Sequence, residues 1–77
     1  MTTKRMQEID DIVLDIWRIK RKLAEILKEE DEYADSLDEN DDDEYFKRKF
    51  AKDTVEILKA AIEYCGKASD KMEEAKG

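Results

Sequence analysis

The 77-residue chain has no proline, two glycines, no histidine and one cysteine. Without proline, and with so little glycine, the usual signals that interrupt helices are missing, which favours few, long elements. The absence of histidine removes the commonest general base and metal ligand. A single cysteine cannot form a disulfide within the chain. This is typical of a reducing compartment, so we expect a cytoplasmic protein.

Long apolar runs are also missing. No stretch of about 18 apolar residues is present, so the sequence predicts neither a membrane span nor a membrane partner. No basic segment precedes an apolar one of the signal-peptide kind, and we expect no secretory leader. A chain of this size is at most one domain, and such domains bury only about 60% of their unfolded surface. Small domains with so limited a core are commonly stabilised by oligomerisation.

Charge is abundant but unevenly placed. Lysine and arginine number 15 and aspartate and glutamate 22, for a net charge of −7. Residues 28–44 hold eleven acids and one lysine, a net −10, whereas residues 1–27 sum to +1 and residues 45–77 to +2. The acidic character therefore belongs to a central segment between two nearly neutral arms.

Both arms repeat apolar residues every seven positions. Ile12, Ile19 and Ile26 form one such column in the first arm, and Phe50, Ile57 and Tyr64 form another in the second. This period predicts two amphipathic helices with charged outer sides. We predict a helix over about 4–35, an acidic turn over about 36–41, and a helix over about 42–74.

Two local signals refine these boundaries. Asp41-x-x-Glu44 fits a capping box at the start of the second helix. Gly66 costs roughly 1 kcal/mol inside a helix, so it leaves open whether residues 67–77 continue the second helix.

Two long helices joined by a short link predict an all-α fold, a single antiparallel helical hairpin spanning residues 1–77. A mirror at residue 40 places position n opposite roughly 80 − n, which brings Lys47, Arg48, Lys49 and Lys52 beside residues 29–32. The apolar arcs cover about 100° and about 160° of the two helices, more than one neighbour can cover.

We therefore expect a homodimeric four-helix bundle of coiled-coil type. A bundle completed by a different protein is the second interpretation. The predicted self-association core consists of Ile9, Ile12, Val13, Ile16, Ile19, Leu23, Ile26, Leu27, Phe50, Val55, Ile57, Leu58, Ala61, Ile62 and Cys65.

The acidic turn resembles a calcium loop only in part. Asp38, Asn40 and Asp42 occupy positions one, three and five of an EF-hand loop, but Asp43 and Lys49 replace its glycine and its bidentate glutamate. We expect no metal ion and no cofactor. The turn is instead a candidate for binding a partner protein. An alternative is an acidic nucleic-acid mimic or inhibitor that acts through residues 38–44, and the candidate residues are Asp38, Glu39, Asp41, Asp42 and Asp43.

A basic cluster follows Trp17 in the first arm. Arg18, Arg21 and Lys22 are candidate contacts to a nucleic-acid backbone. The predicted architecture resembles Rop-like hairpin dimers, and that resemblance implies RNA binding across a bundle face. Nucleic acid is therefore an alternative partner, though not the favoured one.

Paired acidic residues suggest one enzymatic function. Glu29-Glu30 resembles the start of the Glu-Glu-x-x-Glu motif of MazG-like nucleotide pyrophosphatases, although Tyr33 stands at the third glutamate. Asp53-x-x-Glu56 reverses the order of that family's second motif. The resemblance implies an all-α, Mg²⁺-dependent pyrophosphatase as a remote alternative.

No grouping of residues suitable for nucleophilic catalysis is present, since Cys65 lies in an apolar column without a histidine base. We expect no enzyme. The favoured function is a helical interaction protein of regulatory, accessory or inhibitor type that self-associates and binds a macromolecular partner.

Overall fold

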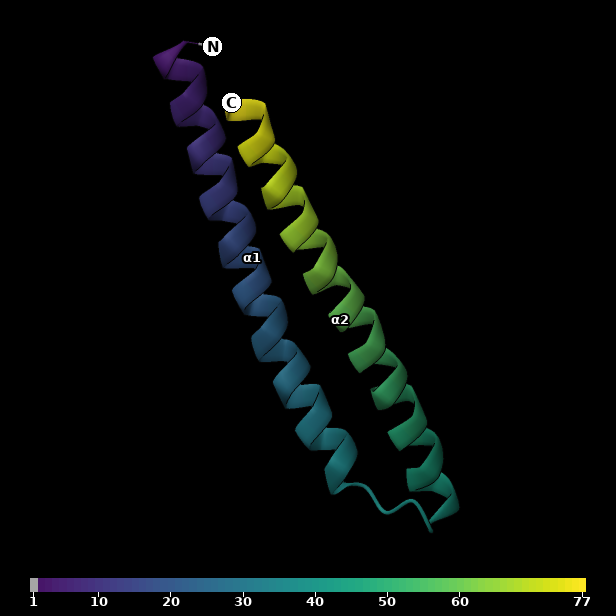
Figure 1. Ribbon diagram of the computed structural model, residues 1–77. Helices are drawn as coiled ribbons and strands as arrows, with labels where there is room; N and C mark the ends of the chain where they lie inside the picture. Colours follow the sequence, from purple (N-terminus) through teal and green to yellow (C-terminus); the bar gives the residue numbers. More distant parts are fainter. Residues whose placement is uncertain (1) are drawn as a thin grey trace.

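The computed structural model describes residues 2–77 and shows two antiparallel helices lying side by side (Figure 1). Helix α1 spans Thr3–Ser36 and helix α2 spans Asp42–Lys76. The hairpin extends 60 Å along its axis and 15 by 11 Å across. The all-α hairpin predicted from the heptad columns is therefore confirmed. The second helix runs past Gly66 to Lys76, which settles the question that this glycine left open.

Side chains cap the start of each helix. The Thr2 hydroxyl accepts a hydrogen bond from the Arg5 backbone N–H at 3.2 Å. A carboxylate oxygen of Asp41 accepts bonds from the backbone N–H groups of Asp43 at 3.0 Å and Glu44 at 3.2 Å. The predicted capping box forms only in part, because the Glu44 carboxylate accepts from the Asp38 N–H at 2.6 Å instead. Glu44 therefore ties the linker to the first turn of α2.

A narrow seam holds the two helices together. Its buried members are Ile9, Val13 and Ala34 in α1, and Ala51, Val55 and Ser69 in α2. Within each helix, the sequence spacing between these residues is four or a multiple of seven, as a heptad seam requires. Most of the other seam residues are only half-buried, and among residues 2–77 no large side chain falls below 2% exposure. The seam alone therefore makes a thin core.

The register of the helices differs from the simple mirror about residue 40. Lys52, which that mirror sets opposite residue 28, reaches Asp31 at 3.2 Å and Asp35 at 3.0 Å. Arg48 donates to the Ala34 carbonyl at 3.5 Å. The contacts thus lie about one helical turn farther toward the linker than expected. In keeping with this register, α1 projects beyond α2 at the end that carries the termini (Figure 1). Neither helix is long and apolar enough to cross a membrane over the residues described.

Candidate self-association face

One side of the hairpin carries the ion pairs between the helices. Lys52 bridges Asp31 and Asp35, and Lys76 pairs with Asp10 near the termini. Asp10 follows the seam residue Ile9, and Lys52 follows Ala51. Positions that follow a seam residue therefore meet on this side, which we call the ion-pair face.

The carboxylates on the ion-pair face hold their lysines in the charged form. The pKa of Lys52 lies above its usual value of 10.5 because its ammonium donates to Asp35 and Asp31. Asp10, and to a lesser extent Glu73, raises the pKa of Lys76 in the same way. Both pairs are partly exposed to solvent, so they set register more than they add stability.

The opposite side of the hairpin carries a run of exposed apolar side chains. Positions that precede a seam residue on the two antiparallel helices flank the same side, opposite the ion-pair face. On α2, two columns of such positions lie side by side: Ala61 and Ala68 lie nearer the seam, and Phe50, Ile57 and Tyr64 lie farther from it. We call the combined surface the apolar face, and it consists of Ile12, Ile19, Ile26 and Tyr33 of α1 with Phe50, Ile57, Ala61, Tyr64 and Ala68 of α2.

The large side chains of the apolar face are open to solvent in the single hairpin. Phe50 is 72% exposed, Ile57 69% and Ile26 47%. The chain exposes 6107 Å² in total, whereas a folded monomer of 9.1 kDa exposes about 4,900 Å². Its radius of gyration is 17.7 Å, against about 11.5 Å for a compact domain of this length. The isolated hairpin thus has far more surface than a finished globular domain.

The fifteen residues predicted as the self-association core divide into three groups. The seam buries Ile9, Val13 and Val55. Six further residues are half-buried members of the seam, namely Ile16, Leu23, Leu27, Leu58, Ile62 and Cys65, and Ala61 is half-buried beside it on the apolar face. Those left exposed on the apolar face are Ile12, Ile19, Ile26, Phe50 and Ile57. The hairpin therefore covers ten of these side chains in full or in part and leaves five uncovered.

Three buried seam residues were missing from the predicted core, namely Ala34, Ala51 and Ser69. Each lies seven positions from a predicted core residue: Ala34 from Leu27, Ala51 from Leu58, and Ser69 from Ile62. The heptad spacing could therefore have found them. The Ser69 hydroxyl donates to the Gly66 carbonyl at 2.9 Å, which satisfies it inside the seam.

The acidic linker uses part of its charge to organise its own backbone. Asp38 accepts from the Asn40 N–H at 2.9 Å, and Asp41 caps α2. Asp42 and Asp43 lie in the first helical turn, where negative charge is favourable. Over residues 2–77, no three acids or cysteines come together as a group that could hold a metal ion.

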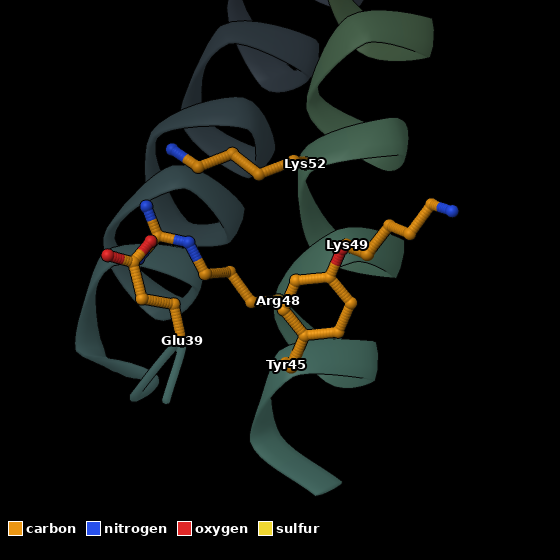
Figure 2. Close-up of a pocket in the computed structure, with 5 residues that line it drawn as sticks. All are labelled: Glu39, Tyr45, Arg48, Lys49 and Lys52. Carbon is orange, nitrogen blue, oxygen red and sulfur yellow. The ribbon is translucent and has the colours of Figure 1, made fainter. Parts of the chain in front are cut away.

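Glu39, the fifth predicted residue of the linker, borders a shallow pocket of about 280 Å³ with Tyr45, Arg48, Lys49 and Lys52 (Figure 2). The pocket is open, and two of its basic groups already bind α1 through Asp31, Asp35 and the Ala34 carbonyl. The linker and the pocket residues therefore hold the two helices together at the linker end of the hairpin.

The basic cluster lies on exposed surface halfway along α1. Arg18, Arg21 and Lys22 are all exposed, and Arg18 pairs with Asp15 at 3.4 Å. Trp17, which follows the seam residue Ile16 and so belongs to the ion-pair face, is 57% exposed. Trp17 and Arg21 therefore lie away from the apolar face, whereas Lys22 precedes the seam residue Leu23 and lies on the side of that face. Comparison of the chain with protein families, characterised proteins and solved structures finds no match.

Proposed function

We propose that this protein is a non-enzymatic interaction protein that self-associates through the apolar face. The observation that carries the proposal is the continuity of this face along both helices, with five large side chains of the predicted core left in water. Monomeric proteins rarely leave contiguous apolar patches of more than a few hundred Å² exposed.

The size of the face suits a stable dimer. Stable interfaces bury about 800 Å² on each partner. The apolar face follows a hairpin 60 Å long and 15 Å wide, and the chain exposes about 1,200 Å² more than a compact monomer of its mass. A second copy offers the same length and the same apolar columns. Two hairpins packed on these faces form a four-helix bundle, in which every helix covers two neighbours.

Light scattering tests the self-association directly. We expect a molar mass of twice the 9.1 kDa chain and a melting temperature that rises with protein concentration. A folded chain of single mass across the micromolar range would refute the homodimer. In that case the apolar face would be free for a different protein, the second occupant that the sequence suggests.

A dimer would present its charged outer surfaces to a further macromolecule of regulatory, accessory or inhibitory function. One observation favours nucleic acid as that partner. Trp17 is 57% exposed and is followed by Arg18, Lys20, Arg21 and Lys22. Basic groups beside an exposed aromatic ring are typical of single-strand binding, where bases stack and phosphates are neutralised.

A gel-shift assay with single-stranded RNA and DNA tests this second function. Binding should weaken steeply with salt and be lost in Arg21→Glu. Lys4→Glu makes the same charge change near the N-terminus and serves as the matched control. Absence of binding at low salt, or equal loss in both variants, would contradict a site at Trp17.

A further inference from the structure

We infer that the two hairpins dock with their acidic ends at opposite ends of the bundle, around a twofold axis that passes Ile19. This inference rests on the proposed self-association and specifies its geometry. Three features of the chain carry it: the distribution of charge along the hairpin, the symmetry of the apolar columns, and the charges beside those columns.

Charge distribution opposes docking with both linkers at the same end. The end of the hairpin formed by residues 28–52 holds eleven acidic and five basic side chains, a net −6. The other end is neutral, since acids and bases balance within residues 1–10 and within residues 67–77. Neighbouring helices lie 8–10 Å apart, which is about the Debye length at physiological salt. Docking with linkers together would therefore leave two like charges of this size poorly screened.

The first helix can pair with its own copy. Ile12, Ile19 and Ile26 are equally spaced, so reversing these three positions about Ile19 returns the same three, while Tyr33 at the end of the column comes opposite the partner's Arg5. In this arrangement Ile19 packs on the partner's Ile19, and Ile12 packs on the partner's Ile26. An isologous interface requires such self-complementarity.

The second helix has small residues at the matching level. The Nζ of Lys20 lies 3.8 Å from the Cβ position of Gly66, so the middle of α1 is level with the part of α2 around residue 65. Ala61 and Ala68 lie almost symmetrically about that level. Because helix separation depends on the side chains at the contact, these alanines allow the two copies of α2 to approach closely.

The charged residues beside the column select the register. Asp15 and Lys22 lie on the outer flank of the Ile12–Ile26 column. An axis at Ile19 places Lys22 beside the partner's Asp15, and it does so twice in the dimer. Moving the partner by one heptad so that the axis shifts toward the linker would instead place Lys22 beside the partner's Lys22 and Asp15 beside the partner's Glu29. Moving it the other way would place Asp15 beside the partner's Asp15, although Lys22 would then lie near the partner's Glu8. Each shifted register therefore brings like charges together.

A spin label at the linker tests the orientation. In an Asn40→Cys, Cys65→Ser chain, the two labels should lie about 60 Å apart in the dimer. A separation shorter than half of that would overturn the inference, because it requires both linkers at one end. Light scattering on the labelled protein separates the two proposals. A monomer would refute self-association, whereas a dimer with a short label distance would refute only the docking.

A charge swap tests the register. Lys22→Glu should weaken the dimer because it faces the partner's Asp15, and the double variant Asp15→Lys/Lys22→Glu should recover the loss. Both positions are exposed in the hairpin, so the fold should survive. Unchanged or tighter association of Lys22→Glu would indicate the shifted register and overturn the axis at Ile19.

Discussion

Lys20 lies against Gly66 across the helix pair: its Nζ comes within 3.8 Å of the point that a Cβ on residue 66 would occupy. Lys20 stands at the seam position between Val13 and Leu27, where the heptad calls for an apolar residue. Residue 66 follows the seam residue Cys65, so it lies on the ion-pair face. A long lysine can leave the seam on this side, extending its methylenes along α2 while the ammonium remains in water.

Gly66→Ala should stabilise the protein. Alanine is favoured over glycine within a helix by about 1 kcal/mol. The added Cβ would meet only the end of the Lys20 side chain, at ordinary contact distance. We expect an increase of several degrees in the melting temperature measured by circular dichroism. A decrease would show that residue 66 needs more space than this contact indicates.

Asp41→Ala should destabilise the protein by about 1 kcal/mol, because it removes the N-cap of α2. The Asp41 carboxylate accepts from two backbone N–H groups, at 3.0 and 3.2 Å. Glu39→Ala removes an acid from the same linker without touching that cap, and its effect should stay within about 0.5 kcal/mol. Equal effects in urea denaturation would mean that loss of charge, and not loss of the cap, determines the change.

Stability should fall at alkaline pH. The pKa values of Lys52 and Lys76 are raised by Asp35 and Asp10 respectively, so the folded chain binds these protons more tightly than the unfolded chain. Their contribution is complete below the ordinary value of 10.5 and is lost as pH rises through the folded-state values.

The double variant Lys52→Met/Lys76→Met isolates this effect. Its melting temperature should lose less than that of the natural sequence between pH 9 and 11.5, measured by circular dichroism at low salt. The same loss in both proteins would assign the alkaline decrease to other groups.

Most of the hairpin could be predicted from the sequence because its signals are local and strong. The heptad columns located both helices, and the Asp41 cap located the start of α2 within the acidic run. The register could not be predicted as well, because a symmetric mirror ignores the path of residues 37–41 and the overhang of α1. Lys52 therefore met Asp31 and Asp35, about one turn from the expected place.

The apolar columns identified the residues of the candidate site, but they did not show which columns the second helix buries and which it leaves exposed. Val13 and Ile12 are neighbours in apolar columns, yet the second helix buries Val13 and leaves Ile12 exposed. Helical periodicity gives the direction of each column relative to the others, but the packing of the partner helix decides which column is covered. Only the structure separates the seam from the face that remains open.

A matched pair of variants measures the central claim most directly. Ile26 is 47% exposed and Leu14 46% exposed in the hairpin, but only Ile26 belongs to the apolar face. Sedimentation equilibrium should show that Leu14→Lys keeps twice the 9.1 kDa chain mass, whereas Ile26→Lys shifts to single chains because each copy would bury an unpaired charge. Equal masses for the two variants, whether both double or both single, would contradict self-association through this face.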